Sequence, residues 1–216
     1  MKLGFLGTGT ITTAVIDGLI KSKARFEQIN ISLRSKKNSS KLKRSSKQIK
    51  VFKDNQDIVD GSSIIVISLV PKVALKELKI LNFKRNQIIV SFASTLNIKT
   101  FRDNCSPAKI IVKAAPLPMA KDGLSPTIIY PNNKVVRKIF EIIGTVIIAK
   151  NEKQNNHLWV MSSFMASYVS IVKTLKDYLK KNKVQNNEAN KYLNTFLTGM
   201  LFEINNQNFD LNKSIK

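Results

Sequence analysis

The spacing of hydrophobic residues divides this chain into two parts near residue 150. In the first part, short apolar runs typical of strands alternate with stretches whose apolar residues recur every three or four positions, as on a helix face. The expected strands cover residues 2–6, 29–33, 49–52, 62–69, 87–92, 109–113, 127–130 and 145–149. The expected helices cover residues 10–22, 39–48, 72–81, 97–103 and 134–143. This alternation predicts an α/β fold built on a doubly wound sheet.

After residue 150 the strand pattern stops and two long helical segments follow, over residues 151–181, with a break expected near Ser162 and Ser163, and over residues 186–205. Each segment carries a broad apolar stripe: Leu158, Met161, Met165, Tyr168, Val169, Val172, Leu175 and Leu179 in the first, and Tyr192, Leu193, Phe196, Leu197, Met200, Leu201 and Ile204 in the second. Two helices of this length cannot bury both stripes alone, so the first domain or a second copy must cover them. We therefore expect an α/β domain over residues 1–150 and a small helical domain over residues 151–216 that forms a homodimer.

The composition excludes several classes of protein. Hydrophobic residues make up 43% of the 216 residues, which is enough for a packed core. The single cysteine, Cys105, excludes an internal disulfide and suits a reducing cytoplasm. One histidine, His157, and the lack of metal-type spacing predict no metal site. Neither a continuous apolar run long enough to span a membrane nor a signal-peptide pattern is present, so we expect no membrane association.

The net charge of +22 raises the question of a polyanionic partner. The lysines are scattered through every segment among Asn, Ser and Ile, and they form neither a basic tail nor an aromatic-laced basic stretch. This distribution favours a soluble lysine-rich surface that attracts small anionic molecules, and we do not expect nucleic-acid binding.

The first strand runs into a glycine turn, Gly7-Thr8-Gly9, which leads directly into a helix. Gly7 allows a sharp exit from the strand, and Gly9 lacks the Cβ that would keep a pyrophosphate from the backbone. The third small position of such motifs falls on Thr12, with Ala14 two residues later. The helix N-terminus, from Thr10 on, offers free N–H groups to phosphates. The turn predicts a dinucleotide site; the alternative is an ordinary glycine-rich strand-to-helix turn.

The segment after the second strand, where such domains select the ribose, is basic. It reads Arg34-Ser35-Lys36-Lys37, and between Asp17 and Asp54 the only acidic residue is Glu27, which precedes the strand. A carboxylate here would bind a 2′-hydroxyl, whereas these cations suit a 2′-phosphate. The segment predicts NADP(H) over NAD(H); the alternative is a solvated basic turn.

The order of motifs resembles the pyrroline-5-carboxylate reductase family. The correspondence runs through the glycine turn (residues 7–14 for G-x-G-x-M-A/G-x-A), Leu33-Arg34-Ser35 (N/D-R-S), Asp54-Asn55 (D-N), residues 68–71 (A-V-K-P), residues 91–95 (S-I-A-A-G), residues 113–119 (R-x-M-P-N-T-P) and residues 162–168 (S-G-S-G-P-A-Y). The resemblance extends to about residue 204 and is strongest over the first 70 residues.

The resemblance implies a Rossmann-type domain, an NADPH cofactor and reduction of the C=N bond of a cyclic imine such as 1-pyrroline-5-carboxylate, giving proline. The cofactor contacts it implies are Gly7, Thr8, Gly9, Thr10, Ile11, Arg34, Ser35, Lys36, Asn55, Ser68, Leu69, Val70, Pro71, Ser91, Ala93 and Pro116. The candidate catalytic hydroxyls are Tyr168, as a proton donor or water-orienting group, and Ser163. A tyrosine packed between helices is the alternative interpretation of Tyr168.

Departures from the family pattern affect the substrate side. The family's lysine before Pro71 is replaced by Val70, its asparagine by Leu117, and its glycine-serine loop by Phe164-Met165. No stretch here matches the family's T-S-P-G-G-T-T loop, which helps to hold the substrate carboxylate. Three functions therefore remain open: a pyrroline-5-carboxylate-type imine reductase, a reductase of the same build acting on another small imine, ketone or deazaflavin-type partner, and a non-catalytic NADP-binding protein.

Overall fold

The structure is a computed structural model of the 216-residue chain, and it describes residues 1–206. It separates into two compact units, Met1–Ser162 and Ser163–Lys216. The last ten residues of the expected helical domain, 207–216, lie outside the described part. The division falls at Ser162 and not near residue 150, because the helix Glu152–Met161 packs against the sheet unit.

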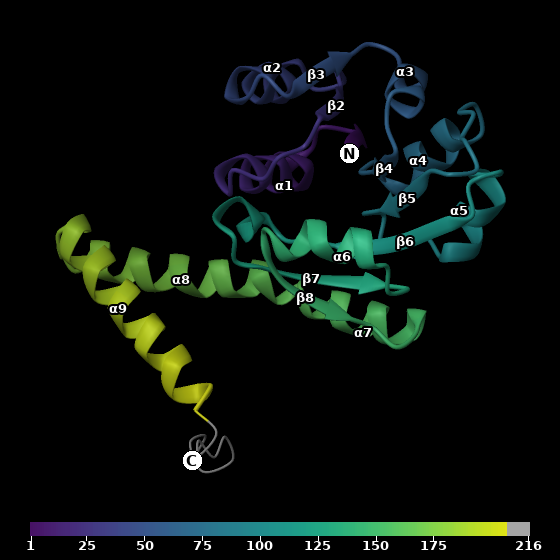
Figure 1. The fold of residues 1–216 in the computed structure, drawn as a ribbon. Coiled ribbons are helices and arrows are strands. Elements are labelled where there is room, and N and C mark those ends of the chain that lie inside the picture. Colours follow the sequence, from purple (N-terminus) through teal and green to yellow (C-terminus); the bar gives the residue numbers. More distant parts are fainter. Residues whose placement is uncertain (207–216) are drawn as a thin grey trace. The chain divides into compact units, whose positions relative to one another are not determined.

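An eight-stranded sheet forms the centre of the first unit, in the order β3-β2-β1-β4-β5-β6-β7-β8 (Figure 1). The strands are β1 (Lys2–Leu6), β2 (Gln28–Ser32), β3 (Ile49–Phe52), β4 (Ile64–Ile67), β5 (Ile88–Ser91), β6 (Ile110–Ala115), β7 (Ser125–Tyr130) and β8 (Gly144–Ile148). The first six are parallel, and the strand order changes direction at β1, which lies between β2 and β4. The predicted α/β, Rossmann-type architecture followed by C-terminal helices is confirmed.

Helices cover both faces of this sheet. They are α1 (Thr10–Lys21), α2 (Lys36–Ser45), α3 (Asn55–Asp60), α4 (Pro71–Leu78), α5 (Ile98–Asn104), the 3-10 helix η1 (Pro118–Asp122), α6 (Lys134–Glu141) and α7 (Glu152–Met161). The apolar strand β4 shows why both faces are covered: Ile64 and Val66 enter one core, and Ile65 and Ile67 enter the other. Alternate residues of one strand thus fill two cores, which produces the continuous apolar run seen in the sequence.

Two local features differ from the expectations. Helix α2 begins at Lys36, three residues before the expected start, because the Ser35 hydroxyl caps it by accepting from the Asn38 N–H. Strand β7 runs antiparallel to β6, since the short connection through η1 cannot provide the crossover that a parallel strand needs.

Helix η1 packs closely on α1, where a Cβ on Gly18 would lie 2.1 Å from the Ala120 carbonyl oxygen.

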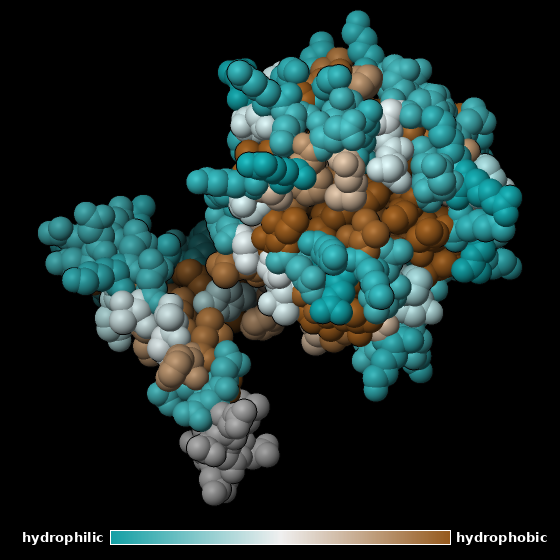
Figure 2. Space-filling model, viewed as in Figure 1, coloured by the Kyte–Doolittle hydropathy of each residue, from teal (hydrophilic) through white to brown (hydrophobic). Residues whose placement is uncertain are grey.

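The second unit contains two helices, α8 (Phe164–Lys181) and α9 (Asn186–Ile204), which pack against each other. The predicted break between α7 and α8 falls at Ser162 and Ser163. Helix α8 has no buried residue, and α9 buries only Ala189 and Leu193. Figure 2 shows apolar side chains exposed along these helices. The stretch Glu152–Lys181, which comprises α7 and α8, contains an 18-residue window with a mean hydropathy of 1.3, so that by length and composition alone it passes the test for a membrane-spanning segment.

Candidate functional site

A cavity of about 420 Å³ opens at the carboxyl edge of the sheet, where the strand order changes direction. Ligands of open α/β sheets bind at such a point. The cavity is lined by Gly7, Thr8, Gly9, Thr10, Arg34, Ser35, Asn38, Ser68, Leu69, Val70 and Val73. The structure therefore brings the glycine turn, the basic segment after β2 and the end of β4 together, as the sequence predicts for a cofactor site.

The two glycines of the turn have different roles. Gly7 has a φ of +103°, and a Cβ there would lie 2.3 Å from the Ser68 carbonyl oxygen. Its N–H donates to the Ser32 hydroxyl at 3.0 Å, so the turn is held against the end of β2. A Cβ on Gly9, by contrast, would meet no atom within 4 Å. Gly7 is therefore needed for the fold, whereas Gly9 leaves open space at the mouth of the cavity.

The N-terminus of α1 faces this open space, and neither a capping side chain nor an acidic side chain of the first turn competes there with a bound anion. Gly9 is its N-cap residue, no side chain caps it, and its first turn contains no acidic residue. The Thr13 N–H donates to the Gly9 oxygen at 3.0 Å. The helical amides that precede Thr13 have no intrahelical acceptor in an α-helix, and they point toward the positive end of the helix dipole, where an anion is favoured. The open space at Gly9 and the N-terminal amides of α1 together fit a pyrophosphate group. Thr12, in the third small position, is fully buried, and its hydroxyl has no hydrogen-bond partner among residues 1–206.

The ribose end of the cavity is built by the start of α2. Ser35 caps α2, and the Asn38 side-chain amide donates to the Thr8 carbonyl oxygen at 2.7 Å. This bond joins α2 to the glycine turn. Arg34, which precedes the capping serine, is exposed and lines the cavity. Asn38 was not predicted as a site residue. Its signal in the sequence is its position three residues after a capping serine.

Several predicted cofactor residues flank the cavity without lining it. Ile11 packs against the core, Lys36 is the exposed first residue of α2, and Pro71 is the first residue of α4. Asn55 begins α3, and its side-chain amide donates to the Glu77 carboxylate at 2.7 Å.

The remaining predicted cofactor residues follow β5 and β6 at the same edge of the sheet. The Ser91 hydroxyl accepts from the Ala93 N–H at 3.1 Å, and Pro116 comes directly after β6. Ser91 lies beside Lys113 in the register of β5 and β6. Lys113 is a buried lysine that was matched to a family motif but not predicted as a site residue.

The candidate catalytic hydroxyls belong to the helical unit. Ser163 precedes α8, and Tyr168, half-buried on α8, has its ring centroid 6.2 Å from that of Phe164. In the sheet unit, burial raises the pKa of the Cys105 thiol to about 12, so it is protonated and unsuited to act as a nucleophile. His157 is exposed on α7. Within residues 1–206, no three His, Cys, Asp or Glu side chains gather as a metal site.

A glycine turn at the change of strand direction, an uncapped helix N-terminus and a basic ribose-side segment together define an NAD(P)-binding domain of Rossmann type. Residues 2–95 match the family model described as "NADP oxidoreductase coenzyme F420-dependent". The chain is also 29% identical over 119 residues to pyrroline-5-carboxylate reductase 3 of Danio rerio. That match covers 54% of this chain and 41% of the fish protein, which is less than half of that relative.

Solved structures resemble the chain over its whole length. The 1-pyrroline-5-carboxylate reductase of Streptococcus pyogenes has a TM-score of 0.84 at 18% identity, with 100% of this chain and 83% of that chain covered. Plasmodium falciparum pyrroline carboxylate reductase, solved with NADP bound, has a TM-score of 0.83 at 21% identity, with 99% and 82% covered. The resemblance to pyrroline-5-carboxylate reductases is confirmed, and residues 2–95 carry the NAD(P)-binding domain of an oxidoreductase family.

Proposed function

We propose that this chain is an NADPH-dependent reductase of a small cyclic imine, with 1-pyrroline-5-carboxylate as substrate and proline as product. The observation that carries the proposal is the open cavity at Gly9, rimmed by Arg34 and Ser35, in a chain whose fold is that of pyrroline-5-carboxylate reductases. The NADP bound in the Plasmodium falciparum structure supports the same class of cofactor here.

The choice of NADPH over NADH rests on charge at the ribose end. Arg34 and Ser35 line the cavity, and the exposed Lys36 and Lys37 follow them. A guanidinium group binds a phosphate through paired charge-assisted hydrogen bonds, which a 2′-hydroxyl cannot match.

In the proposed reaction the bound cofactor supplies the hydride. The glycine turn and the α1 N-terminus bind its phosphates, and the segments after β4, β5 and β6 form the edge that orients its other half and excludes water. The Tyr168 hydroxyl donates a proton to the imine nitrogen or orients a water that does so, and Ser163 supplies a second hydroxyl.

The direct test is oxidation of NADPH, followed at 340 nm, with 1-pyrroline-5-carboxylate and with a panel of other cyclic imines and ketones. Turnover with pyrroline-5-carboxylate is expected, and its loss in Tyr168→Phe but not in Tyr178→Phe would assign the proton donor. Turnover only on other imines or ketones would retain the reductase and change the substrate. Tight NADPH binding without any turnover would favour a non-catalytic role.

A second candidate is hydride exchange between NADPH and a deazaflavin. The description of the matching family model favours it, because that family is named for coenzyme F420. The same assay with oxidised F420 in place of the imine distinguishes the two candidate activities. A deazaflavin loses its visible absorbance when it is reduced, so a fall in that absorbance would show hydride transfer to F420.

We also propose that two copies associate through α8 and α9, in a reducing cytoplasm. Apolar side chains remain exposed on both helices, with Phe196 at 45% and Met200 at 43%. A groove along α8, of about 600 Å³ and lined by small residues such as Ala166 and Ser170, offers room for a second helix. The single cysteine is a buried free thiol, in keeping with that compartment.

Sedimentation of the intact protein and of two α9 variants tests this association. Phe196→Glu is expected to shift the dimer to monomer, and Asn194→Glu, an exposed position with the same added charge, is expected to leave it intact. Flotation of a monomer with lipid vesicles would instead show that the apolar helices meet a membrane.

A further inference from the structure

Lys113 is a buried cation at the carboxyl end of β6, with a side chain only 3% exposed. Its Nζ lies 3.1 Å from the Ser94 carbonyl oxygen, 3.1 Å from Glu152 Oε1 and 3.3 Å from Asn156 Oδ1. An ammonium group has three N–H bonds, and three acceptors surround this one. Lys113 is therefore fully satisfied within the chain and has no hydrogen left to donate to a substrate.

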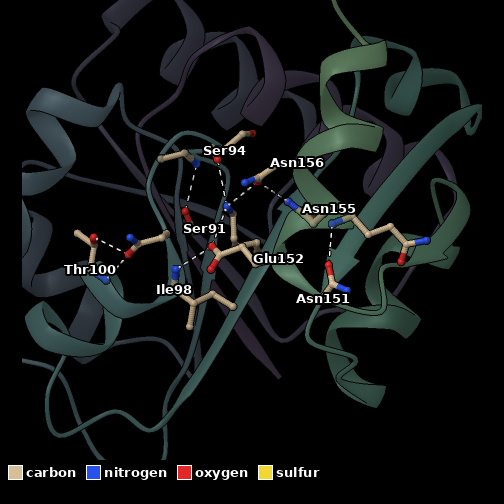
Figure 3. Close-up of polar contacts among 12 residues, drawn as sticks. Ser91, Ser94, Ile98, Thr100, Asn151, Glu152, Asn155 and Asn156 are labelled. Carbon is tan, nitrogen blue, oxygen red and sulfur yellow. Dashed lines mark hydrogen bonds and ion pairs between the residues drawn. The ribbon is translucent and has the colours of Figure 1, made fainter.

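The carboxylate of Glu152, the partner of Lys113, also binds the start of helix α5. Glu152 Oε1 also accepts from the Ile98 N–H at 2.9 Å, which is the first amide of α5. Glu152 is itself the first residue of α7, where a negative charge is favoured by the helix dipole. Figure 3 shows Glu152 and Asn156 of α7 converging with Ser94 and Ile98. One ion pair thus links β6, the loop between β5 and α5, the start of α5 and the start of α7.

Stability alone is a poor reason for this arrangement. Burying the Lys113 ammonium is costly, its partner Glu152 stays 30% exposed, and well-packed apolar side chains often stabilise a fold as much or more. What an ion pair provides is a defined geometry, because each hydrogen bond fixes a distance and a direction. Here the fixed element is residues 91–94, since Ser91 pairs with Lys113 in the sheet and the Ser94 carbonyl binds its ammonium.

This segment lies at the edge of the sheet that a dinucleotide would follow. The glycine cavity is at the ends of β1, β2 and β4, and the next strands along the same edge are β5 and β6. A ligand whose adenosine half occupies the cavity has to extend its other half toward β5 and β6. The Lys113 network lies on this second part of the edge and outside the cavity lining.

We propose that the Lys113–Glu152 pair is a positioning pair, which fixes residues 91–94 so that the edge receives the nicotinamide half of the dinucleotide. This role rests on the cofactor site of the proposed function. In this role Lys113 affects the binding of the nicotinamide half alone, and it does so indirectly, through the position of the Ser91–Ser94 segment.

The test compares two ligands in the apoprotein. Lys113→Met is expected to weaken NADPH binding at least about 10-fold, while adenosine 2′,5′-bisphosphate, which carries only the adenosine half, binds within about 2-fold of the unaltered chain. Lys113→Arg should restore NADPH affinity to within about 3-fold, because it keeps the charge and the donors. Calorimetric titration measures all of these, and none requires turnover.

Two further variants separate positioning from stability. Lys84→Met removes an ion pair of similar length, Lys84–Asp60 at 3.2 Å, that is half exposed, and it should change neither affinity. Lys113→Met combined with Glu152→Met removes both charges and should recover the thermal midpoint without recovering NADPH affinity. Emission of the single tryptophan, Trp159, reports whether α7 stays packed in each variant.

The outcomes are distinct. An equal loss of both ligands in Lys113→Met, or recovery of NADPH affinity in the double variant, would make the pair merely structural and overturn the proposal. Unchanged NADPH binding in Lys113→Met would overturn it as well. If the unaltered chain bound neither ligand, the cofactor site itself would be wrong, and the role of the pair would fail with it.

Discussion

The two units of this chain differ in how far their apolar residues are buried by the chain itself. In the sheet unit, whole strands such as β4 are buried on both faces, whereas α8 buries no residue and α9 buries two. The sheet unit thus has its own core and its own ligand cavity. The helical unit also carries many apolar side chains, but the unit itself leaves most of them exposed. We therefore expect substitutions in the sheet unit to change local packing or the ligand cavity. In the helical unit, we expect substitutions of exposed apolar residues to change the proposed association of two copies.

The sharpest effect is expected at Gly9. Gly9→Trp should reduce NADPH affinity at least about 100-fold, because the side chain would enter the space that the phosphates need. The thermal midpoint should hardly change, since a Cβ there meets no atom within 4 Å. Calorimetric titration and thermal melting check both statements. Unchanged NADPH binding would remove the cofactor site from this edge of the sheet.

Arg34→Asp should have the next largest effect. We expect NADPH to bind about 30-fold more weakly and NADH to change by less than about 3-fold, because only the former has a 2′-phosphate. Lys47→Asp makes the same kind of substitution at an exposed position outside the basic segment and the cavity lining, and it should have a much smaller effect. Equal losses for the two cofactors in Arg34→Asp would refute the preference for NADPH.

Two helix glycines, one in each unit, give a direct comparison of packing. Gly18→Ala in α1 should cost about 1–3 kcal/mol, since the new methyl group would press on the Ala120 carbonyl. Gly199→Ala in α9 should instead add about 0.5–1 kcal/mol, because the position is open and alanine favours the helix. Chemical denaturation followed by circular dichroism measures both changes. A similar response at the two positions would contradict the contrast between the units.

The smallest effect concerns Asp122 in η1. A hydrogen bond from Lys21 lowers the pKa of Asp122, and desolvation partly opposes it. A lowered pKa adds stability above the ordinary value of 3.8, and this stability is lost as the pH falls through the folded-state pKa. Lys21→Met should therefore raise the pKa of Asp122 toward 3.8, which an NMR titration of the carboxyl carbon detects. No movement of this pKa would show that Lys21 and Asp122 do not interact in solution.

Much of the fold could be predicted because the local pattern and the final environment agree. The run over residues 62–69 is apolar throughout, and its centre became β4, buried on both faces. The direction of β7 could not be predicted in this way, since it follows from the short connection through η1 and leaves no mark on the apolar pattern of the strand itself. The assignment of α7 to the sheet unit likewise depends on packing against β7 that no local pattern shows.

That the cofactor-site segments meet around one cavity was predictable for the same reason, because the residues that line it lie next to strand ends. The Lys113 network was not predictable. A lysine at a strand end is usually solvated, and its partners Glu152 and Asn156 are 39 and 43 residues away along the chain. Only the folded sheet brings such groups together.

The contrast between Gly7 and Gly9 also determines what random mutation would tolerate. Position 7 is closed to other amino acids in any folded copy, because its positive φ and the Ser68 carbonyl leave no room for a side chain. Position 9 has no such neighbour, so folding alone does not require a glycine there. In a mutant library selected only for a folded product, position 7 would remain glycine and position 9 would diversify. Under the proposed function, cofactor binding and not folding is what requires a glycine at position 9.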